Sequence, residues 1–206
     1  MRLNTHIIEK VEAINGPFGR TLVLSNLELV SLDNLSITLD SFECLDLSNN
    51  RITYLRCHST LKKLRILLLM DNHIEKIDSL SNCFPNLEDL NLIGNNIKSL
   101  DTLAILKDNK SLKRLYLSGN PIAQNVDLVI FLAARIHSLK IVDFQKLTYQ
   151  DRAAGIEKFG IDLYSLAYKE KLQRVIERAQ SVEDVKKIEF LIKNGKITDE
   201  VLNNLL

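Results

Sequence analysis

Residues 87–97 have the sequence Leu-Glu-Asp-Leu-Asn-Leu-Ile-Gly-Asn-Asn-Ile, which fits the phrase Leu-x-x-Leu-x-Leu-x-x-Asn-x-Ile. The same phrase occurs at residues 64–74 and 112–122, and at residues 42–52 with Phe42 in the first leucine position. The asparagines of the four phrases lie at positions 50, 72, 95 and 120, so successive phrases are separated by 22, 23 and 25 residues. A repeat of this length predicts a stack of similar units that share one continuous core.

This phrase is the signature of the leucine-rich repeat, in which each unit supplies one short strand to a parallel sheet. Two degenerate units extend the array beyond its four clear repeats. Their leucine and asparagine positions are filled by Leu22, Leu24 and Leu27 in the first unit, and by Leu139, Val142, Phe144 and Leu147 in the last. We therefore predict an α/β leucine-rich-repeat solenoid of about six repeats, with a curved parallel sheet, a helical C-terminal cap and a tail.

Side chains alternate between the two faces of a strand, so the leucines of each phrase should point into the core. The asparagine follows the strand where the backbone turns, and its amide can satisfy backbone groups left unpaired in that turn. We interpret Asn50, Asn72, Asn95 and Asn120 as a buried ladder of this kind. The alternative is a row of ligand-binding side chains.

The residues between the leucines should face the concave surface, and several of them are apolar. We predict that a partner binds there through the set Val23, Asp46, Ile66, Leu68, Met70, Asn91, Ile93, Tyr116, Ile141 and Asp143. The third repeat alone contributes Ile66, Leu68 and Met70, and contiguous apolar surface usually marks an interface. The plainer interpretation is random variation on a half-exposed sheet. A groove of this shape suits an amphipathic helix.

Composition restricts the partners. The chain has 27 Lys+Arg and 26 Asp+Glu among 206 residues, so it lacks the basic excess typical of proteins that bind nucleic acid alone. Three cysteines without metal-ligand spacing favour a reducing compartment. The apolar runs are too short for a signal peptide or a membrane span, so no membrane partner is expected.

Catalytic chemistry is not indicated. The sequence has no phosphate-binding glycine loop and no recognisable nucleophile with its base. The four histidines, His6, His58, His73 and His137, are isolated and lack metal-ligand spacing, so we expect surface or turn positions for them. We predict no catalytic residues, no metal and no cofactor.

Helical signals follow the array. The pair Thr148 and Asp151 resembles a capping box and predicts a helix from about residue 149 to residue 159 that closes the core, with Gly160 ending it. A second helical pattern covers residues 162–179, and the pair Ser181 and Asp184 predicts a third start. We therefore divide the chain into a repeat domain with its caps, residues 1–160, and a helical C-terminal extension, residues 161–206. The extension either packs on the solenoid or binds a second partner.

Several segments are more specific than the repeat itself. They are Thr38-Leu39-Asp40-Ser41-Phe42, Val142-Asp143-Phe144-Gln145-Lys146, Asp151-Arg152, Glu157-Lys158-Phe159 and the stretch from Ser181 to Ile197 that begins Ser-Val-Glu-Asp-Val. Together and in this order they resemble the A-prime proteins of the spliceosomal U2 small nuclear ribonucleoprotein. The resemblance covers nearly the whole chain.

The resemblance implies a nuclear, non-enzymatic scaffold whose concave face holds a helix of the B-double-prime protein, an RNA-recognition-motif partner. It also implies that the pair binds a stem-loop of the U2 small nuclear RNA in pre-mRNA splicing, with the RNA contacted mainly through the partner. Arg20 and Lys146, near the corresponding ends of the array, are our candidates for contacts to RNA phosphates. The alternative for each is a solvated surface charge. The C-terminal helices are candidates for contacts with other spliceosomal proteins.

The chain departs from the family in two ways. The family often has a Lys-, Gly- and Pro-rich linker before the terminal helix and an acidic tail after it, whereas here the linker is short and helical in pattern. The concave positions of the third repeat are also more apolar than the family leads one to expect. The second candidate function is a general protein-binding adaptor of the phosphatase-regulatory or dynein-associated type, without RNA.

Overall fold

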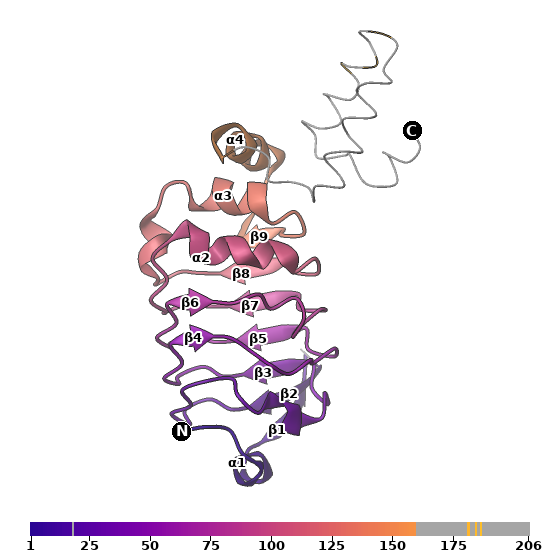
Figure 1. The fold of residues 1–206 in the computed structure, drawn as a ribbon, viewed down its shortest axis with the longest axis vertical. Coiled ribbons are helices and arrows are strands. Elements are labelled where there is room, and N and C mark those ends of the chain that lie inside the picture. The colour runs from indigo at the N-terminus through magenta and orange to yellow at the C-terminus, as the bar shows by residue number, and fades with distance from the viewer. Residues whose placement is uncertain (18, 160–180, 182–183, 185, 187–206) are drawn as a thin grey trace.

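The computed structural model describes residues 1–17, 19–159, 181, 184 and 186. Each of the six predicted repeats supplies one strand to a single sheet, stacked in the order of the chain (Figure 1). These strands are β2 (Gly19–Val23), β3 (Cys44–Asp46), β5 (Ile66–Leu68), β7 (Asp89–Asn91), β8 (Arg114–Tyr116) and β9 (Ile141–Val142). All five neighbouring pairs are parallel, and equivalent leucines lie side by side from Leu22 through Leu45, Leu67, Leu90 and Leu115 to Val142. The predicted fold class and repeat number are confirmed.

Antiparallel strands close both ends of this sheet. At the first end β1 (Ala13–Gly16) pairs with β2, and at the last end β10 (Gln145–Lys146) pairs with β9. The helix α1 (Thr5–Lys10) precedes β1, and its first turn is capped by the Asn4 side chain, which accepts from the Ile7 amide at 3.0 Å. Neither hairpin was predicted from the sequence.

The return segments lie on the opposite side of the core from the main sheet and change in character along the array. Early returns contain η1 (Leu35–Thr38) and the two-stranded sheet of β4 (Tyr54–Leu55) and β6 (Lys76–Ile77). Later returns are helical, with α2 (Leu100–Ala104), η2 (Ile105–Asp108), η3 (Pro121–Gln124) and α3 (Leu128–Arg135). Figure 1 shows α2 and α3 stacked above β4 and β6. Between the two layers the repeat leucines and isoleucines are fully buried, with Phe84 the largest such side chain.

The four asparagines form the predicted buried ladder. The Asn95 side chain is typical: its Oδ1 accepts from the Ile74 amide at 2.9 Å, and its Nδ2 donates to the carbonyls of Leu69 and Leu92 at 2.9 and 3.0 Å. Asn50, Asn72 and Asn120 repeat this pattern, and all four side chains are buried. Each side-chain amide therefore links its own turn to the preceding repeat. In this way buried polar groups of the turns have hydrogen-bond partners.

The helix α4 (Tyr149–Phe159) has the predicted bounds and covers the last repeat. Its capping box is formed, because the Thr148 amide donates to Asp151 Oδ2 at 2.7 Å and the Asp151 amide donates to Thr148 Oγ1 at 3.2 Å. Arg152 donates to the carbonyls of Ala133, at 2.7 Å, and of Leu139. These bonds tie α4 to the end of α3 and to the segment that leads into β9.

Gly155 sets how closely the two cap helices approach. It is buried in α4, and a Cβ built on it would lie 2.0 Å from the backbone oxygen of Ile130 in α3. We expect Gly155→Ala to lower the free energy of unfolding by about 1–3 kcal/mol, as overpacking does, although alanine favours a helix by about 1 kcal/mol. Urea unfolding of the full chain measures the change. Ala154→Gly, at the exposed neighbouring position, is the control and should cost only about 1 kcal/mol.

The helix-start signal predicted at Ser181 and Asp184 also forms. The Ser181 amide donates to Asp184 Oδ2 at 3.1 Å, and the Asp184 amide donates to Ser181 Oγ at 3.1 Å. The expected end at Gly160, the expected helix at 162–179 and the rest of the C-terminal extension lie outside the described residues.

Candidate protein-binding face

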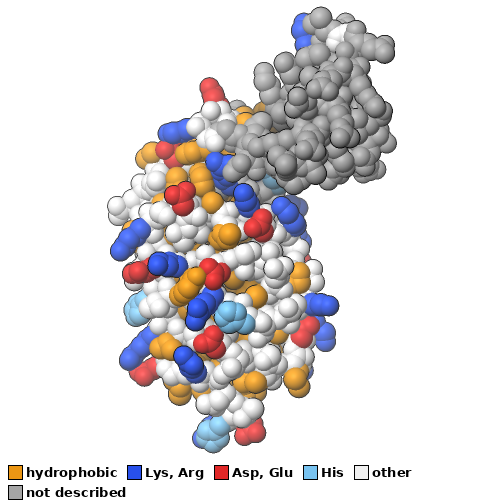
Figure 2. Space-filling model, viewed as in Figure 1, with side chains coloured by type: hydrophobic (Ala, Val, Ile, Leu, Met, Phe, Trp, Pro, Cys, Tyr) orange, Lys and Arg blue, Asp and Glu red, His pale blue; other side chains and the backbone are white. Residues whose placement is uncertain are grey.

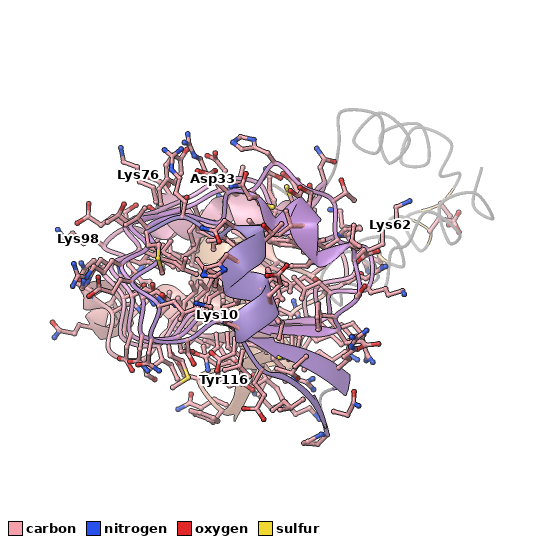
Figure 3. All side chains as sticks on the ribbon, turned by 90° about the horizontal axis from the view of Figure 1, so that it is seen from below. Lys10, Asp33, Lys62, Lys76, Lys98 and Tyr116 are labelled. Carbon is pink, nitrogen blue, oxygen red and sulfur yellow. The ribbon has the colours of Figure 1, made fainter. Side chains whose placement is uncertain are left out.

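The register of the sheet arranges the side chains between the leucines into rows that cross the six strands. One row crosses the start of the strands and contains Thr21, Cys44, Ile66, Asp89, Arg114 and Ile141. The next row, two residues further along each strand, contains Val23, Asp46, Leu68, Asn91 and Tyr116. Met70 and Ile93 follow after two more residues. Figure 3, which looks along the stack, shows Tyr116 on the opposite side of the molecule from Lys76 and Asp33.

All ten residues predicted to bind a partner are half-buried, which is the exposure expected of side chains standing on one face of a sheet. The apolar members form what we call the docking face: Val23, Ile66, Leu68, Met70, Ile93, Tyr116 and Ile141. The third repeat supplies three of them. The adjacent strand β7 leads to Ile93, and β8, one strand further on, carries Tyr116, with Asn91 between it and Leu68. The structure therefore brings the predicted apolar residues onto one surface.

The three polar members also satisfy the backbone. Asp46 accepts from the Ser48 amide and Asn91 accepts from the Ile93 amide, each at 3.0 Å, which stiffens the turn after the strand. Asp143 Oδ1 accepts from the Leu117 and Ser118 amides at 2.7 and 2.9 Å. In earlier repeats the amide equivalent to that of Leu117 donates to a backbone carbonyl of the next repeat. The Asp143 carboxylate takes the place of that carbonyl where the stack ends.

Four other side chains expected on the concave surface are in fact buried: Thr21, Cys44, Ser48 and Asp89. Arg114 forms a two-pronged ion pair with the Asp89 carboxylate across adjacent strands, which helps to cover it. This pair raises the pKa of Arg114 above its usual value. Burial raises the pKa of the Cys44 thiol to about 11, so the thiol is protonated at neutral pH.

A ladder of charges runs along the margin just before the strands. Glu88 accepts from Lys113 at 2.8 Å and from Arg65 at 3.1 Å, and these cations, Lys113 first, hold the pKa of Glu88 below its usual value. A pocket of about 510 Å³ opens at this margin, lined by Pro17, Gly19, Glu43, Arg65, Ile66, Glu88, Asp89 and Arg114. Opposite charges are paired within its walls, which suits a polar rim better than a charged-ligand site.

The two candidate RNA contacts lie far apart. Arg20 is exposed on β2 with its guanidinium 4.9 Å from the Phe42 ring centroid, and Lys146 is exposed on β10 opposite Ile141. Six strand spacings of about 4.8 Å separate β2 from β10. The two cations cannot hold the same phosphate.

The prediction for Phe144 was wrong. Phe144 fills a leucine position of the last repeat, and that position should point into the core. Instead, the residue is 77% exposed. The chain leaves the parallel stack after Val142 and turns back through Asp143 and Phe144, with φ of 44° and 69°. A left-handed conformation costs a residue with a side chain about 1–2 kcal/mol. The Phe144 ring lies against Tyr116, with centroids 5.0 Å apart, so it extends the docking face beyond the last parallel strand.

Two other kinds of feature are absent from the described part of the chain. Within residues 1–17, 19–159, 181, 184 and 186, the His, Cys, Asp and Glu side chains form no cluster that could hold a metal ion. Within the same residues, helices long and apolar enough to cross a membrane do not occur. On the face shown in Figure 2, basic and acidic side chains are interspersed along the repeats.

Known proteins resemble this chain over most of its length. The family model described as leucine-rich repeat matches residues 1–170. The U2 small nuclear ribonucleoprotein A′ of Candida albicans is 29% identical, with 96% of this chain and 100% of the relative covered. That of Schizosaccharomyces pombe is 26% identical, with 96% and 99% covered. Their names describe components of a ribonucleoprotein particle, in agreement with the expectation of a non-enzymatic protein.

A solved structure is similar to this chain in both sequence and fold. One chain of the crystal structure of the Drosophila melanogaster SNF/U2A′ complex superposes with a TM-score of 0.74 at 30% identity, covering 84% of this chain and 99% of its own length. This chain belongs to the leucine-rich-repeat family of U2 small nuclear ribonucleoprotein A′ proteins.

Proposed function

We propose that this protein is a scaffold of the U2 small nuclear ribonucleoprotein whose docking face holds one helix of an RNA-recognition-motif partner of the B-double-prime type. The observation that carries the proposal is the apolar surface formed by Ile66, Leu68 and Met70, with Ile93 one repeat and Tyr116 two repeats further along the array. Support for the kind of partner comes from the solved relative, which was crystallised in a complex with SNF.

The shape and chemistry of the docking face favour a helix. Half-buried apolar side chains stand in rows across the strands, and an amphipathic helix presents apolar side chains at a spacing of three and four residues. The Arg65–Glu88 pair borders the face on one side, and the Arg114–Asp89 pair stands in the row between Ile66 and Ile141. This arrangement of an apolar centre and a polar rim is that of a protein–protein interface.

We further propose that the pair binds a stem-loop of the U2 small nuclear RNA and acts in pre-mRNA splicing, with the partner supplying most RNA contacts. The net charge of +1 and the ion pairs at the margin leave this chain without a strong field for phosphate. An RNA-recognition motif, in contrast, reads loop bases by stacking and hydrogen bonding. Arg20 and Lys146, both exposed, would each add one phosphate contact at opposite ends of the sheet.

This role places the protein in the nucleus. It also leaves the C-terminal extension, most of which lies outside the described residues, as the candidate region for other spliceosomal proteins. Ser181 and Asp184 form a helix-start signal there.

The experiment that tests the proposal is sequencing of the RNA that co-purifies with the tagged full chain from native nuclear extract. We expect strong enrichment of the U2 small nuclear RNA together with an RNA-recognition-motif protein. A parallel purification with Leu68→Arg should lose both at once, because the RNA is held through the partner. If the intact wild-type protein enriches no small nuclear RNA, the function is that of a general leucine-rich-repeat adaptor.

A further inference from the structure

Phe144 occupies a conformation that its residue type disfavours. Asp143 and Phe144 form the two-residue turn between β9 and β10, and both have positive φ. Turns of this geometry are normally made by Asn-Gly or Asp-Gly, because glycine adopts a positive φ without steric conflict. An exposed phenylalanine at the second position is therefore unusual, and backbone strain of this kind gathers at functional sites.

Folding accounts for Asp143 but not for Phe144. The Asp143 carboxylate accepts from the Leu117 and Ser118 amides and ends the sheet. The Phe144 and Tyr116 rings have their centroids 5.0 Å apart and their planes inclined by 46°. Even so, 77% of Phe144 remains exposed. A glycine would make the same turn without strain, and apart from the contact with Tyr116 most of the aromatic ring has no partner in the isolated chain.

The position of Phe144 indicates what it meets. Its ring lies on Tyr116, which belongs to the docking face, so the apolar surface continues past the last parallel strand. The surface that the ring extends is apolar, which favours an apolar protein side chain over a phosphate backbone at this point. The contact between two rings also holds Phe144 in place before binding, which reduces the entropy that binding must remove.

We propose that Phe144, held by Tyr116, is an end anchor of the docking face: it packs against an apolar side chain near one end of the partner's helix and fixes where that helix stops. This inference rests on the proposed function and adds a specificity-determining residue to it. An apolar residue at the matching end of the helix is required, and a charged one there is rejected because it would be desolvated without a partner.

The test compares Phe144→Gly with Leu39→Gly in the full chain. Leu39 is also an exposed apolar residue with positive φ, 52°, but it follows η1 in a return segment away from the docking face. Affinity is measured by calorimetry for the organism's own RNA-recognition-motif protein of the SNF type, and stability by thermal melting. We expect Phe144→Gly to weaken binding about 10-fold or more, as loss of an aromatic anchor does, without lowering the melting temperature. Leu39→Gly should leave affinity unchanged.

The outcomes separate this inference from the proposed function. If Leu68→Arg abolishes binding while Phe144→Gly binds as wild type, the end anchor is overturned and the docking face stands. If neither substitution affects binding, both are overturned. If Phe144→Gly keeps its partner but the complex binds the U2 stem-loop less tightly, the ring contacts RNA instead and the inference is wrong.

Discussion

Replacing Leu68 with arginine should weaken binding of the RNA-recognition-motif partner about 100-fold or more while the solenoid remains folded. Leu68 stands half-buried in the middle row of the docking face, on the strand that also carries Ile66. A guanidinium there would have to lose its water against apolar side chains of the partner, and central interface residues cost about 2–4 kcal/mol or more when disrupted. In the free protein the long side chain can extend into solvent, so folding should be unaffected.

Calorimetric titration of the purified partner into each variant measures this effect. The matched control is Val126→Arg, an exposed apolar residue in the loop before α3, which should bind as wild type. Circular-dichroism melting distinguishes lost binding from lost structure. Gross unfolding of Leu68→Arg would show that Leu68 belongs to the core and that the core face and the docking face of the sheet are assigned the wrong way round.

Replacing Asn95 with leucine should lower the free energy of unfolding by at least about 4 kcal/mol. The side chain accepts a hydrogen bond from the Ile74 amide and donates to the carbonyls of Leu69, Leu92 and Ile93, all in the turns beside the core. Leucine has a similar size but offers no donor or acceptor. Each backbone group left buried and unpaired costs about 1–3 kcal/mol, and the losses fall on two repeats at once.

Urea denaturation followed by circular dichroism gives the size of this loss. Asn82→Leu, at an exposed position in the return segment between β6 and β7, is the control and should stay within about 0.5 kcal/mol of wild type. A loss below about 1 kcal/mol for Asn95→Leu would mean that water enters the turn and replaces the amide.

Much of the fold follows from local pattern. The leucines of each phrase predict the strands and their register, because neighbouring repeats pair equivalent residues such as Leu67 and Leu90. The capping box at Thr148 and Asp151 predicts the bounds of α4. These features depend on residues a few positions apart, which a single sequence displays directly.

Two of the failures have a different, non-local cause. Phe144 was assigned by its place in the phrase, but the last repeat has no successor to pair with, so the chain turns back and the phrase no longer applies. Asp89 is buried because Arg114, one repeat later, lies over it. The hairpin of β1 and β2 had a signal in the run Gly16-Pro17, which marks a turn and was not used. Phe144 and Asp89 thus depend on a neighbour across the stack or on its absence, whereas the β1–β2 hairpin was missed although its signal is local.

The antiparallel strands at the two ends of the sheet have a consequence for self-association. A stack of parallel strands is a template for its own continuation, and an open end would invite copies of the protein to join head to tail into a filament. Here each end presents a strand of reversed direction, β1 with all four residues exposed and β10 only two residues long. A copy that approached either end would meet a strand of the opposite direction, so the parallel register of the stack does not continue from one molecule into the next.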